Sequence, residues 1–331
     1  MIGGAGAATK LSRRLALLGT LAGCAGRPTS SSVPSVEDGV FVMPDGARLP
    51  YRLWWPPARV RAVALALHGM DDSRDAWEVS GPAFAAGGIA IVAPDQRGFG
   101  DATGRGFWPG TDALVADSGT MLRLIAARLP TTPLFGMGES MGAAVLMVLD
   151  AHRPVTLGDT RLAGVVLAAP AIWGRAVMDV FVRTGLFALS HAVPGLALSG
   201  AGQVRASDNI DALRRLSRDR LTIHATRMDA VRGLVDLMDA ALAAVPTISP
   251  PALMMYGAHD QLVPPEATAK AWREIPPGVR RAFYPDGWHL LLRDRHRADP
   301  IGDVLAWIAD PAGPLPSGAD YAARGWLSAQ S

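Results

Sequence analysis

The chain has 331 residues, of which 49% are hydrophobic and 19% are charged. This composition excludes a disordered chain, and the length suits one large α/β domain with an insertion or two ordinary domains. The formal net charge is only +2 and the basic residues form no stripe, so nucleic acid is not expected as a partner.

The N-terminal segment has the features of an export signal followed by a linker. Lys10 and Arg13 precede a short apolar run that is too short to span a bilayer. The single cysteine, Cys24, follows Leu-Ala-Gly, a pattern that resembles a bacterial lipobox. We therefore expect a lipoprotein signal peptide over 1–23, lipidation of Cys24 and a flexible tether over 24–37. The alternatives are a soluble signal peptide or a chance cysteine.

The rest of the chain alternates between predicted strands and helices. Short apolar runs bounded by turn residues predict strands at 39–43, 49–54, 62–67, 89–93, 133–137, 165–169, 252–256 and 281–284. Longer segments with apolar residues at helical spacing predict helices at 111–128, 141–151, 265–274 and 300–308. This alternation is typical of a doubly wound, mostly parallel sheet.

One long segment interrupts the alternation. About eighty residues separate Pro170 from Ala252, which is far too long for a plain crossover connection. Within it, 181–198 is strongly apolar and 208–244 carries apolar residues at helical spacing. The predicted domains are a core over 38–170 and 251–312, a helical cap over 171–250, and a loosely packed C-terminal tail over 313–331.

A G-x-S-x-G motif is formed by Gly138-Glu139-Ser140-Met141-Gly142. It follows an apolar run and opens a helical pattern, which is the strand–turn–helix context of a nucleophile elbow. The glycines Gly138 and Gly142 permit a sharp turn that lifts the Ser140 hydroxyl off the sheet edge. In a glycine-rich chain a bare match is weak, so this context carries the prediction that Ser140 is a nucleophile.

Two residues complete a predicted triad with Ser140. An α/β-hydrolase needs an acid and then a base after its nucleophile, and Asp260 and His289 each follow a predicted strand in that order. Both would lie at the sheet edge that carries Ser140. His289 would take the serine proton, and Asp260 would orient the imidazole. Taken alone, Asp260 would be interpreted as an ordinary turn residue and His289 as an ordinary loop histidine. Their order in the chain and their position after predicted strands favour a catalytic role.

The oxyanion hole needs two backbone N–H groups. One is expected from Met141, directly after the nucleophile, and the other from Met70, in the loop after the strand at 62–67. No metal or organic cofactor is expected. The predicted fold is therefore the α/β-hydrolase fold, with a mostly parallel eight-stranded sheet flanked by helices and a helical cap inserted after the sixth strand.

These motifs together resemble the bacterial monoacylglycerol lipase and lysophospholipase group of α/β-hydrolases, also called serine aminopeptidase-like. The resemblance runs from about residue 40 to residue 310, and its motifs are Leu67-His68-Gly69, Asp95-Gln96-Arg97-Gly98-Phe99-Gly100, Gly138-Glu139-Ser140-Met141-Gly142, Gly257-Ala258-His259-Asp260 and Gly287-Trp288-His289. It implies hydrolysis of single-chain lipid esters through an acyl-enzyme, and a cap with an apolar acyl channel. Phe99 and Ala102 depart from the D-x-R-G-H-G-x-S pattern of this group.

The leading functional hypothesis is a serine carboxylester hydrolase of monoacylglycerol or lysophospholipid. The apolar residues 181–198 would supply an acyl route, or else they form the cap's own core. The alternatives are an aminopeptidase-like peptidase, a short-chain esterase and, less favoured, an inactive lipid-anchored binding protein. The expected partners are a lipid ester and a membrane, the latter through Cys24. The expected location is the bacterial cell envelope, facing the periplasm or the exterior.

Overall fold

The computed structural model describes residues 35–37, 39–199 and 204–330. The predicted signal peptide, Cys24 and the tether up to residue 34 lie outside the described residues. None of the described helices is long and apolar enough to cross a membrane.

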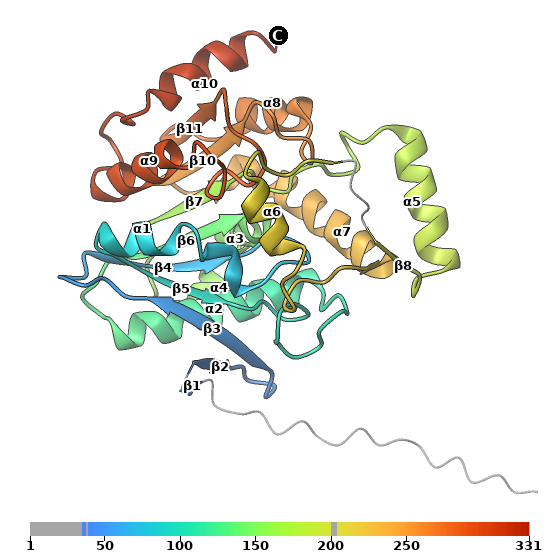
Figure 1. Cartoon of the computed structure of the whole chain (residues 1–331), viewed down its shortest axis with the longest axis horizontal. Helices are drawn as coiled ribbons and strands as arrows, with labels where there is room; N and C mark the ends of the chain where they lie inside the picture. Colours follow the sequence, from blue (N-terminus) through green and yellow to red (C-terminus); the bar gives the residue numbers. More distant parts are fainter. Residues whose placement is uncertain (1–34, 38, 200–203, 331) are drawn as a thin grey trace, which may run out of the picture.

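A nine-stranded sheet runs through the centre of the molecule (Figure 1). In spatial order its strands are β1 (Ser35–Glu37), β2 (Val40–Val42), β3 (Arg48–Trp54), β5 (Ile89–Pro94), β4 (Ala62–Leu67), β6 (Leu134–Glu139), β7 (Gly164–Ala168), β10 (Ala252–Gly257) and β11 (Val279–Tyr284). The first three strands and the β3–β5 pair are antiparallel, and every other pair is parallel. The predicted mostly parallel α/β fold is confirmed.

The strand count differs from the prediction by one. The short strand β1 pairs with β2 and lies within the predicted tether, where a Ser- and Pro-rich composition hides it. Without β1 the sheet has the eight predicted strands, and the predicted cap follows β7, the sixth of them.

Helices cover both faces of the sheet because its central strands are buried along their whole length. In β4, alternate side chains enter opposite cores: Val63, Leu65 and Leu67 pack on one face, and three alanines pack on the other. The first face is covered by α2 (Thr111–Arg128), α3 (Met141–Ala151), α4 (Arg153–Leu157) and α8 (Pro265–Glu274). The second is covered by α1 (Gly81–Ala86) and α9 (Ala298–Ala309).

The insertion between β7 and β10 divides into a packed part and a projecting part. Its elements are α5 (Val180–Ala192), β8 (Ala197–Leu198), α6 (Ile210–Leu216), β9 (Thr226–Arg227), α7 (Met228–Ala244) and the short 3-10 helix Val245–Thr247. Helix α7 belongs to the core, since Leu237 and Ala241 are fully buried beside α3. Helix α5 lies at the edge of the molecule, and only Ser190 in it is buried (Figure 1).

The exposure of α5 corrects both interpretations of the apolar stretch 181–198. Phe181 is 82% exposed and Phe187 is 64% exposed, so this stretch is not the core of the cap. None of its residues lines the pocket at Ser140 either, so it is not the wall of an acyl route in this conformation.

The C-terminal tail is also better packed than predicted. Residues of α10 (Ala319–Ser328) lie against β11, where Trp326 stacks on Phe283 with ring centroids 5.1 Å apart and Ala323 is fully buried. The Pro- and Gly-rich start of the tail concealed a helix of only ten residues, too short for its apolar spacing to stand out.

Candidate active site

Ser140 lies between β6 and α3 in a sharply turned backbone conformation, with φ 54° and ψ −114°. This is the left-handed region that non-glycine residues rarely adopt. Hydrogen bonds fix it: the Ser140 N–H donates to the Ala168 carbonyl at 3.0 Å, and the Ser140 carbonyl accepts the Ala171 N–H at 3.1 Å. The strained turn therefore holds the hydroxyl at the carboxyl edge of the sheet.

The predicted steric role of the elbow glycines is visible in their surroundings. A Cβ on Gly138 would lie 2.5 Å from the Ala143 nitrogen, and one on Gly142 would lie 2.3 Å from the Leu67 carbonyl oxygen. Both neighbours are backbone atoms that cannot rotate away, so any side chain at either position would force the elbow apart.

His289 and Asp260 meet at the same edge. The His289 Nδ1–H donates to Asp260 Oδ2 at 2.8 Å. The other Asp260 oxygen accepts the N–H groups of Leu262 and Val263 at 2.8 and 2.9 Å, which fixes the carboxylate. Because Nδ1 carries the proton, Nε2 is left as the acceptor, and His289 lines the same pocket as Ser140.

The charge state of His289 sets an expected pH profile. Burial lowers its pKa, but the charge and hydrogen bond of Asp260 raise it, and the net result is a pKa above the ordinary 6.5. A general base must be neutral, so kcat/KM is expected to fall as pH falls through a midpoint above 6.5.

The Asp260→Asn variant checks this cause. It should lower kcat by roughly 10⁴-fold and move the midpoint of the acid limb to lower pH, since burial of His289 then acts without the opposing charge. The measurement is hydrolysis of a soluble ester across the pH range. A wild-type midpoint below 6.5, or an unmoved midpoint in the variant, would show that another group governs the limb.

The two predicted oxyanion donors flank Ser140. A Cβ on Gly69 would lie 3.4 Å from that of Ser140, so the loop carrying Met70 passes beside the nucleophile. Met141 opens α3 directly after it. Within the described part of the chain, neither amide N–H donates a hydrogen bond to another protein group. Both are therefore free to bind an oxyanion.

His68 holds this loop in place. Its Nε2 accepts the Gln96 N–H at 3.0 Å, so its proton lies on Nδ1, which donates to the Gly69 carbonyl at 2.8 Å. Burial lowers the pKa of His68, which keeps the ring neutral as this arrangement requires. Phe99, one of the departures from the family pattern, packs edge-on against His68 at 5.7 Å between ring centroids. That substitution thus serves packing beside the site.

A buried ion cluster lies next to Ser140, and the sequence patterns did not predict it. Arg293, only 5% exposed, donates from Nη2 to Asp72 Oδ2 at 2.8 Å and to Glu139 Oε1. Asp72 belongs to the oxyanion loop, Glu139 precedes Ser140, and Arg293 follows His289. One guanidinium group therefore connects the three loops that carry the site. Glu139 is visible in the Gly138–Gly142 motif, but no pattern along the chain identified Arg293 as its partner.

A pocket of about 170 Å³ opens at Ser140. Its apolar walls come from Met70, Leu216, Leu262 and Leu290, and its polar walls come from the residues described above together with Asp71. The cap closes one side, since the Ile223 N–H donates to the Asp71 carbonyl at 2.8 Å and the Thr226 hydroxyl donates to the Asp71 carboxylate. Burial raises the pKa of Asp71 to about 6.

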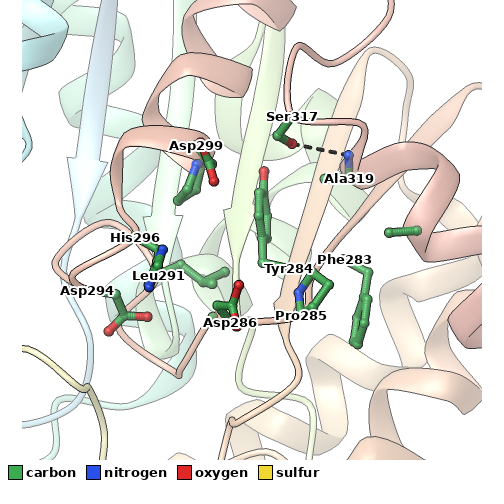
Figure 2. A pocket seen from close by; sticks show the side chains of 13 residues that line it. Phe283, Tyr284, Pro285, Asp286, Leu291, Asp294, His296, Asp299, Ser317 and Ala319 are labelled. Carbon is green, nitrogen blue, oxygen red and sulfur yellow. Dashed lines mark hydrogen bonds between the residues drawn. The ribbon is translucent and has the colours of Figure 1, made fainter.

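Figure 2 shows a second pocket, of about 150 Å³, around Tyr284. None of the predicted catalytic residues lines it, so it is separate from the candidate active site. Asp294, which lines this pocket, connects the loop of His289 to the cap. Its carboxylate accepts the Trp288 N–H at 2.7 Å and the Ser207 hydroxyl. No described group of three His, Cys, Asp or Glu side chains could hold a metal ion.

The sheet topology, the elbow and the hydrogen-bonded histidine at its edge define an α/β-hydrolase. The chain belongs to the family described as serine aminopeptidase, S33, whose model matches residues 58–296. This match confirms the family resemblance predicted from the motifs.

Several proteins similar to this chain are monoacylglycerol lipases. The chain is 23% identical over 266 residues to a monoacylglycerol lipase of Mycolicibacterium smegmatis, covering 80% of this chain and 93% of that one. It is 23% identical to the monoglyceride lipase of Rattus norvegicus, covering 86% and 94%. The crystal structure of Paleococcus ferrophilus monoacylglycerol lipase superposes with a TM-score of 0.65 at 20% identity, covering 78% and 98%. A soluble variant of the Saccharomyces cerevisiae monoglyceride lipase, in complex with a substrate analog, gives 0.67 at 18%, covering 86% and 97%.

Proposed function

We propose that this hydrolase cleaves the ester of a monoacylglycerol or a lysophospholipid through an acyl-enzyme formed on Ser140. The observation that carries the proposal is that Ser140 and His289 line one pocket, and that His289 is hydrogen-bonded to Asp260. The named activities of the monoacylglycerol lipases above support the choice of substrate.

The geometry suggests the following course. The Ser140 hydroxyl oxygen attacks the ester carbonyl while His289 Nε2 takes its proton. The N–H groups of Met70 and Met141 stabilise the negative oxygen of the tetrahedral intermediate. Collapse expels the alcohol, which takes the proton from His289 and leaves an acyl group on Ser140. Water, deprotonated by His289, then attacks the acyl carbonyl. The bond from the acyl carbon to the Ser140 oxygen breaks, His289 returns its proton to that oxygen, and the carboxylic acid leaves.

The pocket supplies specific support for a short-chain esterase as a second candidate. Its volume of about 170 Å³ lies below the roughly 300–1,000 Å³ of a typical ligand site. It can therefore hold a short acyl group or the first part of a long one. A long chain therefore extends beyond the pocket or requires the pocket to widen.

The aminopeptidase alternative draws on the carboxylates of the pocket. Asp72 and Glu139 share the single charge of Arg293, and Asp71 pairs with no cation among the described residues. Such a surplus of acidic groups would suit a substrate ammonium. The apolar wall opposite favours an acyl group, so the ester reaction remains our proposal.

A substrate panel separates these functions. The full-length protein and its Ser140→Ala variant would be assayed side by side. The substrates would be monoacylglycerols and lysophosphatidylcholines of increasing chain length, p-nitrophenyl acetate and butyrate, and aminoacyl amides. Our proposal expects kcat/KM to rise with acyl length and to vanish in the variant. Cleavage of acetate and butyrate alone would establish the esterase. Turnover confined to aminoacyl amides would establish the peptidase.

We also propose that Cys24 anchors the protein to a membrane of the bacterial cell envelope, facing the periplasm or the exterior. The support is the basic and apolar segment that precedes this single cysteine. Replacing Cys24 by serine is expected to move the protein from the membrane fraction to the soluble fraction. Metabolic labelling with a fatty acid would be lost in parallel, and labelling that persists would contradict the assignment.

A further inference from the structure

The face of α5 that turns toward α7 encloses a basic cavity. The cap pocket, as we name it, measures about 270 Å³, and its polar lining is provided by Arg175, Arg183, Thr184, Ser190, His191 and Arg232. No carboxylate is among its lining residues. The charged residues that line it are three arginines.

The arginines of the cap pocket differ in their partners. Arg175 is neutralised by Asp236, at 2.7 Å, and by Asp239. Arg183 and Arg232, in contrast, form no salt bridge and no side-chain hydrogen bond with any residue that the structure describes. Two guanidinium groups on different helices thus line one cavity without a salt-bridge partner, and the nearest charge that acts on Arg232 is that of Asp229 on its own helix. Planar guanidinium groups bind phosphate through paired N–H donors.

The geometry of α5 adds an aromatic wall. Arg183, Phe187 and His191 are spaced by four residues, so they share one face of the helix. His191 Nδ1 donates to the Phe187 carbonyl at 2.7 Å, and its ring lies against the Phe187 ring at 4.1 Å between centroids, tilted by 35°. The hydroxyl groups of Thr184 and Ser190 donate to backbone carbonyls of α5, so the donors left for a ligand are guanidinium groups, which fit a phosphate group.

The surroundings of the cap pocket indicate where that phosphate comes from. At the start of α5, Val180, Phe181 and Val182 are 51%, 82% and 47% exposed. A free phosphate ion would make no use of these apolar side chains. A phospholipid bilayer would, because its phosphates lie next to an apolar interior, and basic residues beside exposed aromatic ones are typical of interfacial helices.

We propose that the cap pocket binds the phosphate headgroup of an anionic phospholipid and holds α5 on a membrane surface. No residue of α5 lines the pocket at Ser140, so this site is distinct from the active site. It does not depend on which ester the enzyme cleaves, nor on lipidation of Cys24.

Vesicle binding tests the proposal. Full-length protein carrying Cys24→Ser and Ser140→Ala, which prevent lipidation and turnover, would be co-sedimented with vesicles of phosphatidylcholine alone or mixed with phosphatidylglycerol. We expect binding to the mixed vesicles only, weakened about tenfold or more by Arg183→Glu with Arg232→Glu. The matched control is Arg59→Glu with Arg161→Glu, two exposed arginines that precede β4 and β7 at the opposite edge of the sheet. It has the same net charge and should bind within about twofold of the parent.

Each other outcome overturns the proposal. If both double variants bound the mixed vesicles equally weakly, the effect would be one of overall charge. If neither variant bound them more weakly than the parent, the cap pocket would not be the binding site. A calorimetric titration with inorganic phosphate separates the two sources: tight binding of phosphate that the Arg183 and Arg232 changes abolish, without vesicle binding, would identify a free-phosphate site instead. Thermal unfolding of every variant confirms that the fold is retained.

Discussion

Replacing Ser140 by alanine is expected to lower kcat for a soluble ester by roughly 10⁴- to 10⁶-fold. The change removes the attacking oxygen and nothing else. Alanine takes up the same left-handed turn at no greater backbone cost than serine, and the hydrogen bonds of the Ser140 N–H and carbonyl are retained. Thermal unfolding should therefore be almost unchanged, which makes any loss of rate a loss of chemistry.

A matched pair of variants checks that Ser140 acts together with His289. His289→Ala should cost about as much as Ser140→Ala, and the double variant should be no slower than either, because residues that act as a unit are not additive. A fluorophosphonate probe should add its mass to the wild type and not to Ser140→Ala. A variant rate within about tenfold of wild type would point to another nucleophile, and a wild type that is both inactive and unlabelled would favour the inactive binding protein.

Local patterns predicted the core of this enzyme well. The helices at 111–128, 141–151 and 265–274 begin and end as predicted, because each begins directly after a residue suited to a turn: Gly110, Ser140 or Pro264. The junction of Ser140, His289 and Asp260 could be predicted for a different reason. Parallel strands end at one edge of a sheet, so chain order alone brought together residues that are far apart in the sequence.

What could not be predicted depends on long-range partners. The charge of Arg293 is evident in the sequence, but its burial against Asp72 and Glu139 follows from three loops meeting in space. The apolar face of α5 illustrates the opposite error. Hydrophobicity at 181–198 was interpreted as burial, yet none of the described elements covers Phe181, which is 82% exposed. A sequence records which side chains are apolar and not whether protein or lipid covers them.

The second large effect is expected at Arg293. Arg293→Met keeps much of the side-chain volume but leaves Asp72 and Glu139 buried without a cation, at 5% and 2% exposure. Breaking a buried ion pair from one side costs about 3–5 kcal/mol of unfolding free energy. The measurement is denaturant unfolding, and a triple variant that also carries Asp72→Asn and Glu139→Gln is expected to recover a large part of the loss, since no unpaired charge then remains.

A purely structural role of Arg293 would leave the titration of His289 unmoved, whereas the charges of this cluster predict a shift. The negative charge of Glu139 raises the pKa of His289, and the positive charge of Arg293 lowers it. Arg293→Met should therefore move the acid limb of kcat/KM to higher pH, and Glu139→Gln should move it to lower pH. Opposite shifts from two neighbouring side chains have no explanation in loosened packing, which would act in one direction. If the limb stayed unmoved, or if both variants moved it the same way, Arg293 would be a structural brace alone. If they move it apart, the ion cluster that joins the three loops also adjusts the basicity of His289.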